Sequence, residues 1–161
     1  MVFGCRTIEN ETPHEAGRAL LAQLYRDTFG GTLPPVAVTD RGKPYFPDNP
    51  VHFSITHTRR HAFVALSDRP IGIDAEELDR SVNPKLSHKI LSPGEKAQYD
   101  AAPDKNRALL IFWVLKESQA KCTGEGLRGY PYHTEFSLDD PRVFEHSGCI
   151  AAIIEEDPHA V

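Results

Sequence analysis

The sequence has few cysteines and no long hydrophobic run. Cys5, Cys122 and Cys149 form an odd set without short spacing, which excludes a disulfide framework or a CxxC zinc site as the organising principle. The longest apolar stretch, 108–115, falls far short of the roughly 20 residues that span a bilayer. The first residues lack the basic flank and long apolar region of a signal peptide. We therefore expect a soluble, cytoplasmic protein that does not contact membranes.

Positive charge is also scarce. The chain has 23 acidic and 18 basic residues and a formal net charge of −5. Binding along a nucleic acid requires a clustered positive excess that neutralises phosphates, so we expect no nucleic-acid partner. This charge is still compatible with a local binding site for a small anion.

The length and hydrophobic content are sufficient for a folded core. With 161 residues, 40% of them hydrophobic, the chain can form one compact domain or two small, tightly packed halves.

The order of predicted elements favours the α+β class. Helical spacing followed by Gly30-Gly31 predicts a helix from about His14 to Phe29. Strand-like runs separated by short polar turns predict an antiparallel meander over 51–56, 61–66 and 71–75. Later patterns predict helices over 83–91, 92–99 and 104–121, then strands around 134–138, 143–146 and 149–154. This order has no regular βαβ alternation, which argues against a doubly wound sheet.

Two charged residues occupy unusual positions on the longest predicted helix. Lys116 lies between Phe112 and Trp113 on the face that should be buried, and Glu117 lies at the edge of that face. Burying a lone charge is costly, so these residues need partners or a cleft. Two alternatives remain open for Lys116: an internal ion pair or a side chain that reaches water, and a functional cleft.

Two further carboxylates follow an apolar strand. Asp74 and Glu76 are two positions apart, so both side chains point to the same side of the strand 71–75. Paired carboxylates with room for water and phosphate suit Mg²⁺ better than zinc. An ordinary acidic strand end in solvent is the alternative. If the long helix packs on this strand, Glu117 adds a third carboxylate.

Cations and hydroxyls elsewhere in the sequence can complete such a site. Lys43 lies on a Gly-Lys-Pro turn, Thr56 and His57 end a predicted strand, and Lys121 follows Glu117 by one helical turn. Each is unremarkable alone, because a loop lysine is usually solvated. Together with a metal ion they would form a site for a phosphorylated ligand.

These segments, in this order, resemble the 4′-phosphopantetheinyl transferases. That family moves the phosphopantetheine arm of coenzyme A to a serine of an acyl or peptidyl carrier protein. Its pattern is a (I/V)G(I/V)D-x-E strand followed about forty residues later by W-x-x-K-E-x-x-K. Here the segments are GKP (42–44), FSITHT (53–58), IGIDAE (71–76) and FWVLKESQAK (112–121), and the resemblance extends from about Gly17 to Leu138.

The resemblance also implies an architecture. In small trimeric holo-acyl-carrier-protein synthases the metal aspartate lies near the N-terminus, whereas Asp74 follows a whole half-domain. The chain is therefore similar to the surfactin-synthetase-activating (Sfp) type, a pseudo-dimer of two similar α+β halves. We expect an N-terminal half over 1–70 on the nucleotide side of coenzyme A and a C-terminal half over 71–161 with the metal and catalytic motifs. We also expect a monomer.

Residue roles follow from the same resemblance. It implies Mg²⁺ as cofactor, bound by Asp74, Glu76 and Glu117. A serine hydroxyl is a weak nucleophile that needs a base; Glu117, beside the metal, is the candidate, with a metal-bound water as the alternative. Lys121 would neutralise the phosphate and the departing 3′,5′-ADP. The residues implied to contact the coenzyme A phosphates are Arg18, Lys43, Thr56, His57 and Lys121.

The sequence departs from the family pattern at two places. Thr56 replaces the usual serine before the histidine but keeps the hydroxyl group, and Arg6 is the only cation before Arg18. Two alternative functions are a Mg²⁺-dependent phosphohydrolase and a non-catalytic relative that binds coenzyme A or a carrier protein.

Overall fold

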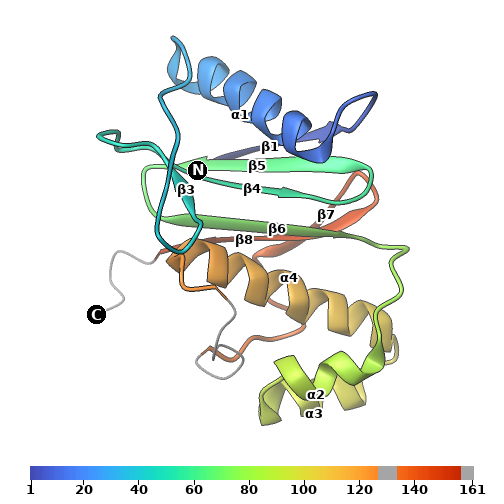
Figure 1. Ribbon diagram of the computed structural model, residues 1–161. Helices are drawn as coiled ribbons and strands as arrows, with labels where there is room; N and C mark the ends of the chain where they lie inside the picture. The colour runs from blue at the N-terminus through green and yellow to red at the C-terminus, as the bar shows by residue number, and fades with distance from the viewer. Residues whose placement is uncertain (127–133, 157–161) are drawn as a thin grey trace.

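Two helices flank a pair of stacked three-stranded sheets (Figure 1). The computed structural model describes residues 1–126 and 134–156. The first sheet has the strand order β1-β5-β4 and is covered by one helix; a separate two-stranded ribbon joins β2 to β3. These elements are β1 (Val2–Thr7), α1 (Pro13–Phe29), β2 (Ala37–Val38), β3 (Pro44–Tyr45), β4 (His52–His57) and β5 (His61–Ser67).

The second sheet has the strand order β6-β8-β7 and is covered by the longest helix. Its elements are β6 (Ile71–Glu77), a 3₁₀ turn η1 (Pro84–Leu86), α2 (Ser87–Ile90), α3 (Pro93–Ala101), α4 (Lys105–Thr123), β7 (Val143–His146) and β8 (Cys149–Glu155). Both sheets are antiparallel. In each sheet the strand that comes last in the sequence, β5 or β8, lies in the middle. A long helix separates the first strand from the second in each case.

The mixed composition of helices and antiparallel strands confirms the expected class. Residues around both long helices explain their ends: Thr12 and Glu15 form a capping box before α1, and Gly30 ends it. Asp104 caps the start of α4, and Gly124 ends that helix in the left-handed conformation. All three cysteines are free thiols.

The expected meander is wrong at its third strand. β4 and β5 do pair, but β6 pairs with β8 in the other sheet. The reason is β1, a strand that the sequence analysis missed. Because β1 occupies the second edge of β5, that edge cannot accept β6.

The strand expected around 134–138 is also absent. Residues 135–137 have no regular secondary structure, and their backbone bonds to side chains of α3 rather than to a strand. Phe136 N–H donates to Glu95 Oε1, while the Gln98 side-chain amide donates to Phe136 O and accepts from Leu138 N–H. The Gln98 side-chain amide thus bonds to a backbone carbonyl and a backbone N–H of residues 136–138, the groups that a neighbouring strand would otherwise pair.

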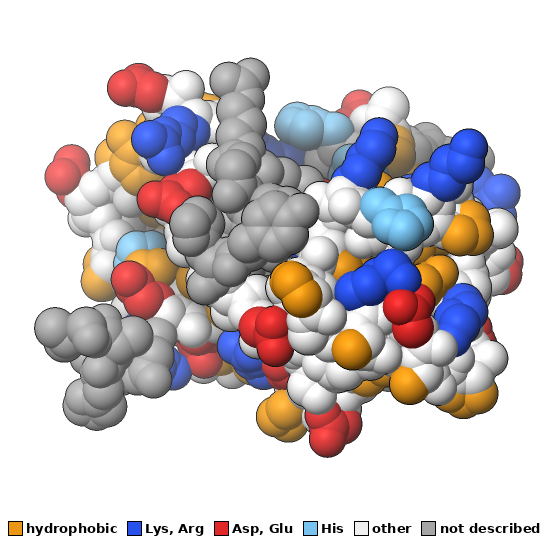
Figure 2. All heavy atoms as spheres, turned by 90° about the horizontal axis from the view of Figure 1, so that it is seen from below, with side chains coloured by type: hydrophobic (Ala, Val, Ile, Leu, Met, Phe, Trp, Pro, Cys, Tyr) orange, Lys and Arg blue, Asp and Glu red, His pale blue; other side chains and the backbone are white. Residues whose placement is uncertain are grey.

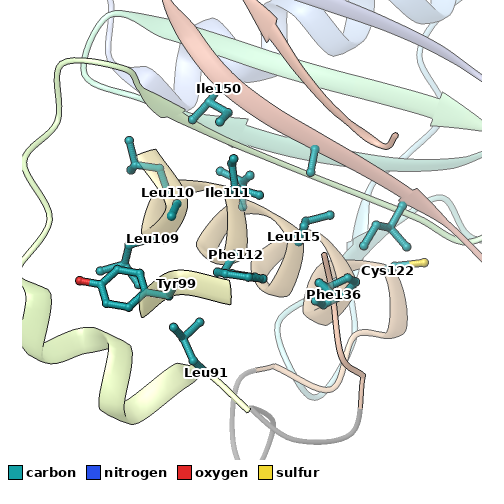
Figure 3. Close-up of a cluster of buried hydrophobic side chains, with 14 residues drawn as sticks. Leu91, Tyr99, Leu109, Leu110, Ile111, Phe112, Leu115, Cys122, Phe136 and Ile150 are labelled. Atoms are coloured by element: carbon teal, nitrogen blue, oxygen red, sulfur yellow. The ribbon is translucent and has the colours of Figure 1, made fainter. Parts of the chain in front are cut away.

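Three layers of hydrophobic side chains hold the elements together. Leu20, Leu21 and Tyr25 of α1 pack on the outer face of the first sheet. Phe63 and Ile73 belong to the layer between the two sheets. Side chains of α4 pack against the second sheet and α3, and Figure 3 shows Leu109, Leu110, Phe112 and Leu115 with Tyr99, Phe136 and Ile150.

Gly72 permits an unusually close approach between β6 and α4. A Cβ atom at this position would lie 1.9 Å from the Ser118 carbonyl oxygen and 2.5 Å from the Cys122 nitrogen. Only glycine allows backbone contact at this distance. The contact sets the part of α4 that carries Glu117 and Lys121 directly against the strand that carries Asp74.

The surface seen from the α4 side carries charges of both signs. Lys and Arg side chains lie among Asp and Glu side chains on this face (Figure 2). None of the helices within residues 1–126 and 134–156 is long and apolar enough to cross a membrane.

Candidate active site

Asp74 lies at the centre of the polar groups between β4, β6 and α4. Its side chain is buried, and its Oδ1 accepts hydrogen bonds from Thr56 Oγ1 at 2.9 Å and from Lys121 Nζ at 2.6 Å. Its Oδ2 is also buried and has no hydrogen-bond partner among the described residues. A buried acceptor without a partner is costly, and an added cation would remove this cost.

Side chains bridge the two sheets at this point. Ser54 Oγ accepts a hydrogen bond from Ile73 N–H at 3.1 Å, and Thr56 reaches Asp74 two residues further along β4. Lys121 adds a contact from the helix, since its ammonium group also donates to Ile73 O at 3.2 Å. Thr56, Asp74 and Lys121 are therefore held by three different elements.

Glu76 extends the acidic surface along β6. Its Oε1 accepts a hydrogen bond from Trp113 Nε1 at 3.1 Å and an ion-pair contact from Arg80 Nη1. The sequence analysis assigned no role to either donor. The i, i+4 rule for side-chain pairs applies within a helix, whereas Glu76 lies in β6 and Arg80 follows a turn, so the sequence offered no signal for this pair. The contact to Trp113 depends on tertiary packing.

Glu117 is partly buried beside these carboxylates. Its pKa is raised above the usual value, first because burial disfavours the charged form and then because Asp74 and Glu76 repel a further negative charge; Lys121 opposes the shift. The four side chains thus share one electrostatic environment.

The carboxylates fit a hard divalent cation in donor type, though they are not yet gathered around one point. Within the described residues, no three acidic, histidine or cysteine side chains are close enough together to hold a metal ion. Asp74 Oδ2, however, is a buried oxygen without a partner among the residues that the structure describes. Oxygen donors of this kind suit Mg²⁺.

A cavity of about 250 Å³ opens beside these residues. The turn that carries Lys43 forms one wall, Ile55 of β4 contributes another, and Glu117 and Lys121 line the α4 side. Lys43 Nζ donates to the Cys122 carbonyl in the last turn of α4. Burial lowers the pKa of Lys43, because desolvation disfavours its charged form.

Sequence comparison identifies the family. Residues 70–156, more than half of the chain, match the family model described as the 4′-phosphopantetheinyl transferase superfamily. The chain belongs to this superfamily.

Curated relatives carry the same name. The chain is 36% identical over 93 residues to the 4′-phosphopantetheinyl transferase of Bacillus subtilis, covering 56% of this chain and 41% of that protein. It is 30% identical over 88 residues to the 4′-phosphopantetheinyl transferase gsp of Aneurinibacillus migulanus, covering 53% and 36%. It is 29% identical over 116 residues to the 4′-phosphopantetheinyl transferase psf-1 of Bacillus pumilus, covering 71% and 46%. Each match thus covers less than half of the relative's length.

The two remaining residues that the sequence analysis predicted for the site of this transferase-family chain lie further out. His57 is exposed at the end of β4, directly after Thr56. Arg18 is exposed on α1 and, like His57, does not line the cavity described above. The structure therefore brings together Thr56, Asp74, Glu76, Glu117 and Lys121, places Lys43 at the cavity wall, and leaves Arg18 and His57 at the periphery.

Lys116 of the family motif is buried in the core and does not line the cavity. Its Nζ forms an ion pair with Glu95 Oε2 at 2.8 Å, and both side chains are almost completely buried. Glu95 also completes the capping box of α3 with Ser92, as its sequence position predicts. Of the alternatives left open for Lys116, the structure supports the internal ion pair.

Proposed function

We propose that this chain transfers the 4′-phosphopantetheine arm of coenzyme A to a serine of an acyl or peptidyl carrier protein and releases 3′,5′-ADP. The observation that carries this proposal is the buried Oδ2 of Asp74, which has no partner within residues 1–126 and 134–156 and lies in the electrostatic environment of Glu76, Glu117 and Lys121. Family membership makes phosphopantetheinyl transfer the chemistry that best accounts for these groups.

We further propose that the chain is a pseudo-dimer of the Sfp type, with halves over 1–70 and 71–161. The equal strand order of the two sheets, each with a long helix after its first strand, supports this division. Lys43 and Ile55 of the proposed N-terminal half and Glu117 and Lys121 of the proposed C-terminal half line the same cavity, which also supports the division.

Asp74, Glu76 and Glu117 are the proposed Mg²⁺ ligands. When bound, Mg²⁺ would offset the charge of the coenzyme A diphosphate and of the phosphoryl transition state. Thr56 and Lys121 both donate hydrogen bonds to Oδ1 of Asp74, so Oδ2 is the oxygen that would bind the cation.

Cations around the cavity are proposed to bind the phosphates of coenzyme A. Lys121 lies beside the carboxylates, and Lys43 would exchange its bond to the Cys122 carbonyl for one to a phosphate oxygen. A half-buried ammonium gains more from such a contact than a solvated one, because water screens it less. His57, Arg18 and the Thr56 hydroxyl complete the proposed set at the nucleotide end.

Glu117 is proposed as the group that accepts the serine proton. A serine hydroxyl is a weak nucleophile, so a base must take its proton as the oxygen attacks phosphorus. Glu117 and Lys121 both line the cavity, so the carboxylate could face the incoming serine while the neighbouring ammonium group faces the phosphate.

We also propose that the chain acts as a monomer in the cytoplasm and binds neither nucleic acid nor membranes.

The test is mass spectrometry of an apo carrier protein incubated with the chain, coenzyme A and Mg²⁺. We expect the mass increase of one phosphopantetheine arm per carrier. Asp74→Ala should lower the initial rate at least about tenfold, which corresponds to about 1.4 kcal/mol of transition-state stabilisation. Asp68→Ala is the matched control, because Asp68 is highly exposed, and it should leave the rate unchanged.

Other outcomes would contradict the proposal. Diphosphate hydrolysis without a carrier protein would indicate a phosphohydrolase, and coenzyme A binding without any mass increase would indicate a binding module. A loss below tenfold in Asp74→Ala would remove Asp74 from the metal ligands.

A further inference from the structure

Glu76 is held through only one of its two carboxylate oxygens. Trp113 Nε1 and Arg80 Nη1 both donate to Oε1. No hydrogen bond within residues 1–126 and 134–156 involves Oε2. The side chain itself is mostly buried, with 16% of its surface exposed.

The two donors approach from different elements. Trp113 belongs to α4 and lies one helical turn before Glu117, so the two share one side of the helix. Arg80 lies just after β6, one residue beyond the turn that follows Glu77. The same side of α4 thus carries the Glu117 carboxylate and the Trp113 N–H group that bonds to the Glu76 carboxylate.

The carboxylates need this restraint because they repel one another. Asp74 and Glu76 lie two positions apart on β6, and α4, which packs on that strand, carries Glu117 one turn after Trp113. A glutamate side chain with several rotatable bonds would otherwise turn outward to reduce this repulsion, at little cost in a partly open site. Donors fixed on Oε1 oppose that rotation and leave Oε2 available.

We propose that Trp113 and Arg80 are positioning residues that preset Glu76 to bind the divalent cation through Oε2. The inference rests on the proposed function, because it needs the cation that Asp74, Glu76 and Glu117 are proposed to bind. Groups that hydrogen-bond a ligating carboxylate typically change metal affinity 10- to 100-fold when removed. Trp113 thereby acts on the metal through Glu76 rather than by touching substrate.

The test measures Mn²⁺ binding to the full chain by the loss of the free-Mn²⁺ signal in electron paramagnetic resonance. Trp113→Phe keeps an aromatic ring and the net charge but removes the N–H donor, and we expect about tenfold weaker Mn²⁺ binding. Arg80→Lys keeps the positive charge but loses the planar guanidinium fork, and we expect weaker binding here too.

Two controls separate positioning from general stability. In a Glu76→Ala chain, adding Trp113→Phe should leave the residual Mn²⁺ affinity unchanged, because the carboxylate that Trp113 holds is already missing. Arg107→Lys changes another arginine of similar exposure, which pairs with Glu145, and it should bind Mn²⁺ as the wild-type chain does.

The remaining results distinguish the inference from the function on which it rests. If the wild-type chain fails to bind Mn²⁺, the proposed metal site is wrong and the positioning role falls with it. If the wild-type chain binds Mn²⁺ and Trp113→Phe stays within twofold of it, only the positioning role is overturned. Tighter binding by Arg80→Lys would show that Arg80 competes with the cation. Should Trp113→Phe fail to fold, Arg80→Lys alone decides between these results.

Discussion

The two oxygens of Asp74 have different surroundings. Oδ1 accepts hydrogen bonds from a hydroxyl and an ammonium group, whereas Oδ2 is buried and has no partner in the described part of the chain. Leaving a buried acceptor unsatisfied costs about 1–3 kcal/mol. Binding a cation at Oδ2 would recover this cost.

A single-atom change at Glu117 tests its proposed role as base. Glu117→Gln keeps the size of the side chain but provides no carboxylate to accept a proton, so coenzyme A should still bind while arm transfer falls by at least about a hundredfold, the usual contribution of general base catalysis. Calorimetry of coenzyme A binding and the carrier mass assay measure the two effects.

The control for this change is Glu125→Gln, at an exposed carboxylate just after α4, which should transfer the arm at the wild-type rate. Transfer by Glu117→Gln at near wild-type rate would place the base elsewhere.

Sequence reasoning reached the carboxylates through local geometry. The i, i+2 spacing identified Asp74 with Glu76, and the helical period identified Glu117 with Lys121. The structure brings these four side chains together. Trp113 was missed as a partner of Glu76 because its contact depends on how α4 lies against β6. Arg80 was missed because its contact depends on the turn after β6, where Arg80 N–H donates to Glu77 O.

At the scale of elements, buried polar side chains fix α3 to its neighbours. Glu95 accepts hydrogen bonds from the backbone of Ser92 and Phe136 and pairs with Lys116 of α4. Ser92 and Glu95 are close enough in sequence for a local pattern to specify their capping box, but no local pattern specifies these longer-range contacts. For the same reason the sequence analysis predicted a strand over 134–138, where the hydrogen-bond partners are side chains of a helix.

Removing one partner of the buried ion pair should be strongly destabilising. Lys116→Met preserves much of the side-chain volume but leaves the Glu95 charge buried without its cation. We expect a loss of about 3–5 kcal/mol in the free energy of unfolding, measured by urea denaturation.

The double variant Glu95→Gln with Lys116→Met should lose less than the sum of the two single losses, because no uncompensated charge remains. Strict additivity of the two single variants would contradict a direct ion pair.

Gly72 controls the distance between a strand and a helix. In Gly72→Ala the new Cβ would overlap backbone atoms of Ser118 and Cys122, which cannot turn aside as a flexible side chain can. We expect destabilisation of more than about 3 kcal/mol, at the upper end for overpacking, measured by thermal and urea unfolding.

Gly4→Ala is the matched control for Gly72→Ala. Its Cβ would meet only side-chain atoms of Leu20 and Leu24 at 3.3 Å or more, so its loss should be much smaller. Equal losses in the two variants would show that close backbone packing is not what requires Gly72.

At the scale of the whole molecule, the layer between the sheets joins both parts of the chain. Phe63 and Ala65 come from β5, whereas Ile71, Ile73 and Ala151 come from the second sheet. The sequence predicted the element types but assigned β6 to the first sheet, since chain proximity favours pairing with β5. The pairing of β1 with β5 is a long-range contact, and this contact decided the topology.

This shared layer predicts that both parts unfold in one transition. Trp113 is the only tryptophan and lies on α4, so its fluorescence reports on the second sheet and its helix. Far-ultraviolet circular dichroism reports on helices and strands of the entire chain. Because the inter-sheet layer contains side chains from both sheets, neither sheet can lose its partner without exposing buried apolar surface, and the two urea curves should coincide.

The decisive variant is Phe63→Ala, at a side chain that is fully buried in the first sheet. Removing this ring should lower the free energy of unfolding by about 3–5 kcal/mol. If the transition is cooperative, the midpoint of Trp113 fluorescence shifts to lower urea by the same amount as the circular dichroism midpoint, although Phe63 and Trp113 belong to different sheets. A fluorescence midpoint that stays in place while the circular dichroism curve divides into two steps would show instead that the two parts unfold independently. The slope of free energy against urea scales with the surface exposed, so it would then be smaller for each step than for a single transition of the entire chain.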